Sequence, residues 1–375
     1  MKFWWGPIVQ FFLNMLAPVG IAIGVALSVN LLLLATLRWH GHLSLDSSTG
    51  VQRNHSETTP RIGGVAVLTG VLAGWVWTPE ASQSLLGCLI VSGIPAFGFG
   101  LAEDLTKQVS VRARLIATMA CGVLGYFLTG HSITAVNLPG IDWLLGFPLL
   151  SIAFTAFAVA GVANAVNIID GMNGLASGTV LINLCIFALI SQSLGDAALV
   201  QACMVLAAGV LGFMLINWPF GKIFLGDAGA YFLGFSVAWL AVLMLARHPE
   251  VSAWAPLLIC GFPILEVLFS MHRRWRRQQD IGAPDRLHLH SLVNRRLVRR
   301  LLPKGSRLMR NSVTGALMWG VGLLPASIAL HFYTNTSALV IGLALCAFMY
   351  SAVYARLTQF HWCFWSVAQP STARV

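Results

Sequence analysis

The chain has 375 residues, of which 57% are hydrophobic and only 10% are charged, and its formal net charge is +10. A soluble domain averages about 25% charged residues, so this composition excludes an ordinary water-soluble domain. Basic loops beside anionic lipid account for the positive charge, so the charge does not indicate a nucleic-acid partner.

Apolar runs of about 18 residues or more predict helices that cross a membrane. Eleven such runs follow one another along the chain: 14–36, 62–79, 84–102, 113–130, 148–166, 174–194, 196–216, 228–246, 253–271, 313–332 and 337–356. The predicted fold class is therefore an all-α, polytopic membrane protein. We expect residues 1–375 to form one integral membrane domain.

The distribution of Lys and Arg predicts the orientation of these spans. Alternate loops carry 21 of the 23 basic residues, and the remaining loops carry only Lys2 and Arg247. The positive-inside rule assigns the basic loops to the cytoplasm. The N-terminus is then outside, and an odd number of spans leaves the C-terminus in the cytoplasm.

The first polar motif, Thr59-Pro60-Arg61-Ile62-Gly63-Gly64, leads into the second predicted span. Its glycines allow close helix packing. Arg61 lies at the predicted cytoplasmic edge, where it could be a membrane anchor or a phosphate ligand. The sequence alone does not separate these two roles.

Two adjacent carboxylates, Glu103 and Asp104, follow the third predicted span. Crowded carboxylates repel each other, and they favour a bound cation or a shared proton. The alternative is a solvated helix end paired with Lys107 or Arg112.

Asn164, Asn167 and Asp170 recur at a spacing of three residues at the end of the fifth predicted span. This spacing places them on one broad face of a helix. The glycines that follow allow a turn and a close backbone approach. The alternative is a polar helix end, in which Asn and Asp cap the helix or bond a neighbouring one.

A second carboxylate motif, Gly226-Asp227-Ala228-Gly229, opens the eighth predicted span, shortly after Lys222 and Phe224. The N–H groups of a helix start attract phosphate, and Asp227 could hold a divalent cation. The alternative is an Asp that caps the helix, with glycines for helix packing.

The segment Asp285-Arg286-Leu287-His288-Leu289-His290 offers two imidazoles among many arginines. Such a group suits an anionic diphosphate, although membrane anchoring is a competing role for the arginines.

The carboxylates Glu103, Asp104, Asp170 and Asp227 converge on one predicted membrane face, which favours a catalytic site there. A secondary transporter is the main rival, because its polar groups should lie near the bilayer midplane and Glu266 falls inside the ninth predicted span. A lipid-binding scaffold is a second rival, but it would not need the carboxylates.

Taken together, the motifs TPRIGG, GLAEDLTKQVSVRARL, NAVNIIDGMNGLASG, FLGDAGAYFLG and HLH resemble those of the polyprenyl-phosphate N-acetylhexosamine-1-phosphate transferases, within glycosyltransferase family 4. The resemblance runs from about residue 46 to 295. It implies a bacterial inner-membrane enzyme that transfers an N-acetylhexosamine 1-phosphate from a UDP-sugar, first of all UDP-N-acetylglucosamine, to undecaprenyl phosphate. UMP would leave, and the product would initiate a cell-surface polysaccharide such as O-antigen.

The resemblance also implies the cofactor, the partners and the site residues. The cofactor would be Mg²⁺, with Mn²⁺ as a substitute, held by Asp227 and Asp104. The partners would be the UDP-sugar, the polyprenyl phosphate, the bilayer and, as one arrangement, a second copy in a homodimer. The catalytic residues would be Glu103, Asp104, Asp170 and Asp227. The substrate-binding residues would be Arg61, Asn164, Asn167, Asn173, Phe224, His288 and His290.

Three positions depart from the family pattern. Glu103 stands where the family usually has Asp, and Asn173 stands where a second Asp is common. Ser291 follows His290, so the three-His run of the muramoyl-pentapeptide enzyme is absent, which argues against that substrate.

Overall fold

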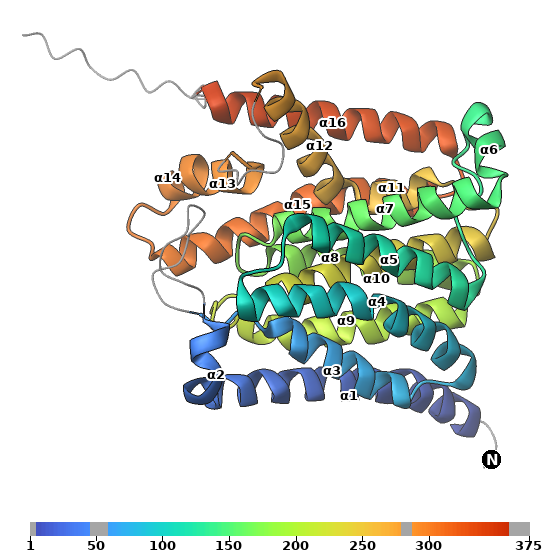
Figure 1. Cartoon of the computed structure of the whole chain (residues 1–375), viewed down its shortest axis with the longest axis horizontal. Coiled ribbons are helices and arrows are strands. Elements are labelled where there is room, and N and C mark those ends of the chain that lie inside the picture. The colour runs from blue at the N-terminus through green and yellow to red at the C-terminus, as the bar shows by residue number, and fades with distance from the viewer. Residues whose placement is uncertain (1–4, 46–58, 279–286, 360–375) are drawn as a thin grey trace, which may run out of the picture.

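The computed structural model describes residues 5–45, 59–278 and 287–359, with side chains from residue 15 onward (Figure 1). Its long helices are α1 (Trp5–Ala35), α3 (Gly63–Val76), α4 (Glu80–Thr106), α5 (Val111–Thr129), α7 (Pro148–Ile169), α8 (Leu175–Ser193), α9 (Ala197–Asn217), α10 (Gly226–Arg247), α12 (Gly261–Arg276), α15 (Arg307–Phe332) and α16 (Thr336–Gln359). Its short helices are α2 (Leu37–Ser44), α6 (Pro139–Leu145), α11 (Trp254–Ile259), α13 (Leu289–Val293), the π-helical turn η1 (Asn294–Val298) and α14 (Arg299–Leu301).

The all-α, polytopic fold class is confirmed. Nine helices of the described chain are long and apolar enough to cross a membrane: α1, α4, α5, α7, α8, α9, α10, α15 and α16. Nine of the eleven predicted spans therefore correspond to such helices. A spanning helix satisfies its backbone hydrogen bonds internally, which is why uninterrupted apolar runs adopt this form.

The second predicted span is shorter than its apolar run suggests. Helix α3 has only 14 residues, which is about 21 Å at 1.5 Å per residue, against a hydrocarbon core of about 30 Å. Pro79 limits it at the far end, because the residue before a proline disfavours helical geometry. The first residues of α3 lie in the polar site described below.

The ninth predicted span, 253–271, is not one continuous helix. It is divided at Cys260 into α11 and α12, and α12 continues to Arg276. Pro263 has no N–H to donate to the carbonyl oxygen of Ile259, and Gly261 adds flexibility at the same point. The break lets α12 leave the bundle at an angle (Figure 1).

Helix α10 is the centre of the bundle. Eighteen of its 22 residues are buried, and it contacts α3, α4, α5, α7, α8 and α9. Its first turn therefore lies at a point where loops from several helices meet.

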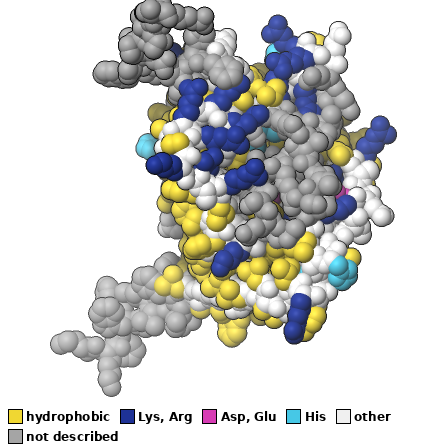
Figure 2. Space-filling model, turned by 90° about the vertical axis from the view of Figure 1, so that its left-hand side faces the viewer, with side chains coloured by type: hydrophobic (Ala, Val, Ile, Leu, Met, Phe, Trp, Pro, Cys, Tyr) yellow, Lys and Arg dark blue, Asp and Glu magenta, His cyan; other side chains and the backbone are white. Residues whose placement is uncertain are grey.

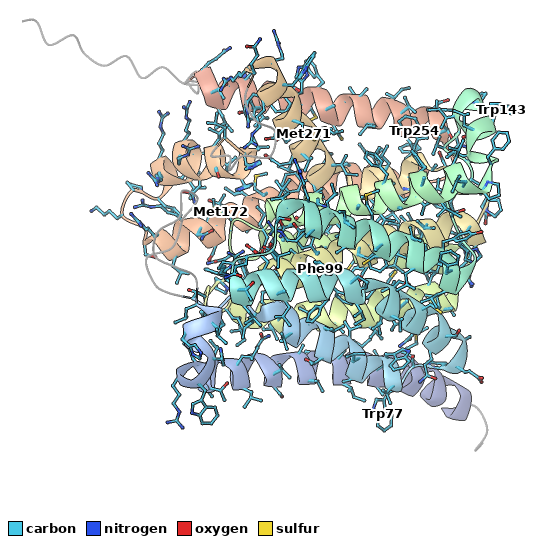
Figure 3. All side chains as sticks on the ribbon, in the orientation of Figure 1. Trp77, Phe99, Trp143, Met172, Trp254 and Met271 are labelled. Atoms are coloured by element: carbon cyan, nitrogen blue, oxygen red, sulfur yellow. The ribbon has the colours of Figure 1, made fainter. Side chains whose placement is uncertain are left out.

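That end of the bundle is also the basic end. Figure 2 looks onto it and shows many Lys and Arg side chains, which α12, η1 and α14 help to supply. Met172 lies in this half of the bundle, whereas Trp77 and Trp143 lie in the other half (Figure 3). The basic end matches the predicted cytoplasmic end, and its sidedness stays a prediction.

Candidate active site

The segment before α3 runs beside the start of α10. The N–H of Phe224 donates to the carbonyl oxygen of Pro60 at 2.8 Å, and the N–H of Gly63 donates to that of Phe224 at 2.9 Å. The N–H of Gly64 donates to the carbonyl oxygen of Leu225 at 2.8 Å. The glycines allow this close packing, as predicted, because a Cβ on Gly64 would clash with the backbone nitrogen of Gly229 on α10. The pairing also brings Arg61 to Asp227.

The carboxylate of Asp104 caps helix α10 from the end of α4. Its Oδ1 accepts from the N–H of Asp227 at 3.0 Å, and its Oδ2 accepts from the N–H of Ala228 at 2.9 Å. The first N–H groups of a helix have no partner within it, so an anion is well placed there. Gly226 permits the contact: its φ is +74°, and a Cβ at this position would lie 2.6 Å from Asp104 Oδ2.

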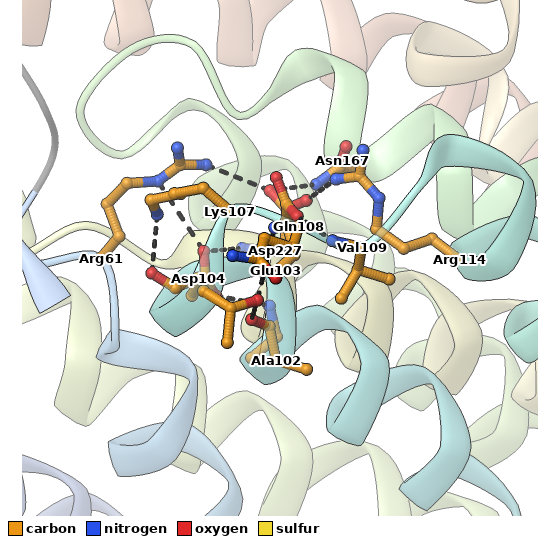
Figure 4. A network of polar contacts seen from close by, with 12 residues as sticks. Arg61, Ala102, Glu103, Asp104, Lys107, Gln108, Val109, Arg114, Asn167 and Asp227 are labelled. Carbon is orange, nitrogen blue, oxygen red and sulfur yellow. Dashed lines mark hydrogen bonds and ion pairs between the residues drawn. The ribbon is translucent and has the colours of Figure 1, made fainter. Parts of the chain in front are cut away.

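Asp227 is 6% exposed and is the hub of the site (Figure 4). Its Oδ1 accepts from Arg61 at 3.1 Å and from the Asn167 amide at 3.2 Å, and its Oδ2 accepts from Arg114. Arg61 Nε also lies 3.8 Å from Asp104 Oδ1. Two guanidinium groups and two carboxylates from three distant parts of the chain thus share one small polar site, the Asp227 cluster, which consists of Arg61, Asp104, Arg114 and Asp227.

Glu103 points to a different partner from Asp104. Its Oε2 accepts from the N–H of Val109 at 2.9 Å, which ties the loop before α5 to the end of α4. Lys107 Nζ donates to the main-chain oxygen of Asp104 at 2.6 Å. The carboxylates of the pair therefore separate, and only Asp104 reaches the Asp227 cluster by a hydrogen bond or ion pair that the structure shows.

Asp170 ends helix α7 and lies in the electrostatic field of the cluster. Burial is the largest cause that raises the pKa of Asp170; the charge of Arg61 lowers it, the charges of Asp227 and Asp104 raise it, and the net pKa is about 7. A carboxyl group of this kind can accept or hold a proton near neutral pH.

Two predicted asparagines are engaged away from Asp227. The amide of Asn164 donates to Thr118 Oγ1 at 3.3 Å and to the carbonyl oxygen of Ala160 at 2.8 Å. Asn173 is 1% exposed, and its amide donates to Ser312 Oγ on α15 at 3.2 Å. In these contacts Asn164 bonds α7 to α5, and Asn173 bonds the 170–174 loop to α15.

The two histidines lie together beside the turn that follows Asp170. The rings of His288 and His290 are stacked, with centroids 5.4 Å apart and an interplanar angle of 7°. A Cβ on Gly171 would lie 2.8 Å from His290 Nε2, so this ring lies directly against the turn after Asp170. Phe224, which is half-buried, belongs to the segment that pairs with Pro60 and Gly63.

Sequence reasoning missed two residues of this region. Arg114 was only one of several basic residues near the start of a predicted span, and nothing in the pattern distinguished it from Arg112. Glu266 was placed inside a span, where it favoured a transporter. In the structure it binds His288 Nδ1 at 3.0 Å.

The polar cluster offers two carboxylates, those of Asp104 and Asp227, as possible ligands for a divalent cation. Among the described residues, no group of three or more His, Cys, Asp or Glu could hold a metal ion by itself. Mg²⁺ commonly takes only one or two carboxylates and completes its shell with water and substrate phosphates. Asp227 could take this role if Arg61 and Arg114 move aside, because their guanidinium groups now occupy its two oxygens.

Comparison with known proteins links these residues to a family of transferases. Residues 86–245 match a family described as glycosyl transferase family 4, a range that contains Asp104, Arg114, Asn167, Asp170 and Asp227. The relatives include a probable undecaprenyl-phosphate N-acetylglucosaminyl 1-phosphate transferase of Bacillus subtilis, which is 30% identical over 63% of this chain and 66% of its own length.

Two further relatives are named undecaprenyl-phosphate alpha-N-acetylglucosaminyl 1-phosphate transferase. The protein of Escherichia coli K12 is 27% identical over 65% of this chain and 67% of its own length. That of Yersinia pestis is 25% identical over 68% of this chain and 70% of its own length. The similarity thus spans about two thirds of each relative.

Proposed function

The chain belongs to glycosyl transferase family 4, and we propose on this basis that it transfers an N-acetylhexosamine 1-phosphate from a UDP-sugar to undecaprenyl phosphate. UDP-N-acetylglucosamine is the donor that the names of the relatives favour. UMP leaves, and the lipid-linked sugar starts a cell-surface polysaccharide of the O-antigen type. We place the enzyme in a bacterial inner membrane, with its site open to the cytoplasm.

One observation carries this proposal: the Asp227 cluster at the start of α10. Asp104, Asp227, Arg61 and Arg114 come from separate parts of the chain and contact one another at one end of the bundle. A transporter would place such groups near the middle of its helices. A lipid-binding scaffold would have no need of buried, paired carboxylates.

The donor would bind with its diphosphate at this cluster. Mg²⁺, or Mn²⁺ in its place, would be held by Asp227 with help from Asp104, and it neutralises the diphosphate when bound. Arg61 and Arg114 supply further positive charge for the phosphates as their contacts with Asp227 loosen. Phe224 would stack on the uracil, and His288 and His290 would contact the diphosphate.

The acceptor phosphate attacks the β-phosphorus of the donor directly. A phosphate oxygen is already ionised near neutral pH, so it needs little activation. Asp170 can take the remaining proton of the monoester, because its pKa is about 7. The hydrogen bond that Glu103 accepts from Val109 favours a role in holding the loop before α5. A catalytic role of Glu103 is proposed in addition.

Glu266 no longer favours a transporter. Its carboxylate accepts hydrogen bonds from His288 and from the N–H of Leu289, and a further one from Tyr350. These contacts tie the histidine segment to the bundle, which accounts for the one polar group that had supported the rival function.

The deciding experiment is an assay of the purified protein in detergent with undecaprenyl phosphate, Mg²⁺ and a panel of UDP-sugars. We expect UMP and a lipid-linked sugar, with UDP-N-acetylglucosamine as the best donor, and neither product when EDTA or Asp227→Asn is used. Absence of UMP with every donor, from protein that is shown to be folded, would contradict the proposed function. Size measurement in detergent tests the homodimer separately.

A further inference from the structure

Glu266 is a fully engaged carboxylate that the reaction outlined above does not use. It lies on α12 and is 1% exposed. Its Oε1 accepts from His288 Nδ1 at 3.0 Å and from the N–H of Leu289 at 2.9 Å, and its Oε2 accepts from the Tyr350 hydroxyl at 2.9 Å. A buried charge is costly unless it is hydrogen-bonded, and here donors from two other parts of the chain satisfy it.

A second contact from α12 holds the same segment. Arg273 donates to the carbonyl oxygen of Leu287 at 3.0 Å and to the Tyr354 hydroxyl on α16 at 2.6 Å. Arg273 thus holds Leu287, and Glu266 holds the next two residues, His288 and Leu289. The contact of Arg273 with the carbonyl oxygen of Leu287 does not involve Glu266, so it still holds the main chain before α13 when Glu266 is changed.

The bond to Glu266 determines the state of the His288 ring. A carboxylate oxygen only accepts, so Nδ1 carries the hydrogen, and Nε2 is the ring nitrogen that gains or loses a proton. In the protonated form of the ring, the carboxylate is the counter-ion of the imidazolium, as the buried Asp of a catalytic triad is. His288 stacks on His290, whose ring lies against Gly171. The orientation of the His288 ring therefore affects the position of His290 and of the turn beside Asp170.

We propose that Glu266 is a positioning residue for phosphoryl transfer, and that it acts through His288 by fixing the tautomer and orientation of that ring and by balancing the charge of its protonated form. This inference rests on the proposed function. In the reaction, an oxygen of the acceptor phosphate bonds to the β-phosphorus while the bond from this phosphorus to the bridging oxygen breaks. The electron pair leaves on that oxygen, which becomes part of UMP. The protonated form of His288 carries N–H on both nitrogens, and in this form its Nε2–H donates a hydrogen bond to the charge that develops on that oxygen, with no proton transferred.

The test compares two changes at Glu266 that separate charge from shape. Glu266→Gln keeps the size and one acceptor oxygen but removes the charge, whereas Glu266→Asp keeps the charge on a shorter side chain. We expect Glu266→Gln to lower kcat by about 10- to 100-fold, the range for residues that orient a functional histidine, with a much smaller change in KM for the donor. Glu266→Asp should recover part of this loss.

Tyr350→Phe is the matched control, because it removes a hydrogen bond from the same carboxylate without touching His288. We expect the unfolding midpoint to fall but kcat to change less than about threefold, since the lost charge-assisted bond stabilises the buried carboxylate without contacting the His288 ring. A loss in Tyr350→Phe as large as that in Glu266→Gln would mean that Glu266 has a general structural role, and it would overturn the proposal.

A double-mutant cycle shows whether Glu266 acts through His288. If it does, Glu266→Gln causes no further loss of kcat in a His288→Asn background, because the ring it positions is already gone. Independent, multiplying losses would overturn the inference. If Glu266→Gln does not fold in detergent, the same cycle is measured with Glu266→Asp. Wild-type protein that releases no UMP refutes the proposed function instead, so the two failures are distinguishable.

Discussion

Replacing Asp104 by Asn tests how the site is built. The carboxylate uses one oxygen for the N–H of Asp227 and the other for the N–H of Ala228, and it is fully buried. An amide can accept only one of these bonds, and its NH₂ group then faces the second N–H. Leaving a buried donor unpaired costs about 1–3 kcal/mol, and a lost charge-assisted bond costs a similar amount.

We therefore expect Asp104→Asn to lose about 2–3 kcal/mol of stabilisation at the start of α10. If displacement of Asp227 adds the whole of this loss to the activation free energy, kcat falls by about 30- to 150-fold. The assay is UMP release at saturating donor and acceptor, together with a thermal unfolding midpoint in detergent. Glu103→Gln is the control, because Glu103 holds only the N–H of Val109, and we expect a loss of less than about tenfold.

A titration with Mg²⁺ separates the two roles of Asp104. If Asp104 mainly positions the start of α10, raising Mg²⁺ does not restore the rate of Asp104→Asn. If it mainly binds the cation through a second lone pair, the rate recovers at high Mg²⁺. A wild-type rate and a wild-type unfolding midpoint in Asp104→Asn, at ordinary Mg²⁺, would refute the reasoning altogether.

Further predictions concern other parts of the site and its sidedness. Asp227→Asn should abolish transfer while the protein stays folded in the membrane, because an amide is a poor Mg²⁺ ligand; measurable turnover near the wild-type rate counts against the metal assignment. Arg114→Met should raise KM for the donor by at least about tenfold and Arg114→Lys by less, as steady-state kinetics would show. Asn164→Ala should lower the unfolding midpoint by a few degrees and leave kcat within about fivefold, since its amide bonds only α7 and α5; a loss as large as that of Asp227→Asn would show a direct role. In cysteine-free protein, a cysteine at the exposed Gln108 should react with an impermeant thiol reagent only after cells are opened, and one at the exposed Gly140 should react in intact cells; the reverse pattern contradicts the orientation.

The sequence predicted the helices and the segments that meet at the site, because both depend on local patterns. Apolar runs determine spans, and the scarcity of charge made Asp104 and Asp227 conspicuous. The division at Cys260 was missed because its apolar run is uninterrupted, although Pro263 and Gly261 were the available signal. A hydropathy average does not show that the proline lacks a backbone N–H.

The fine allocation of roles within the site could not be predicted. Asn164 and Asn167 share a helix face, yet only the amide of Asn167 is seen to bond Asp227, which depends on where α10 begins. Arg112 and Arg114 are equally basic, and the direction of each side chain from α5 decides which one reaches the carboxylate. Glu266 was correctly placed on a helix, but its partner His288 is 22 residues away in the chain.

The pairing of Asp227 with both Arg61 and Arg114 has a consequence for how ligands enter. A divalent cation that binds Asp227 competes with two guanidinium groups for the same oxygens. The displaced guanidinium groups then need an anion, which a diphosphate provides. Under the proposed function, cation and donor would therefore each favour the binding of the other, and thermodynamic linkage would require the two effects to be equal. Such a site would bind the metal weakly by itself and would fill only together with the nucleotide.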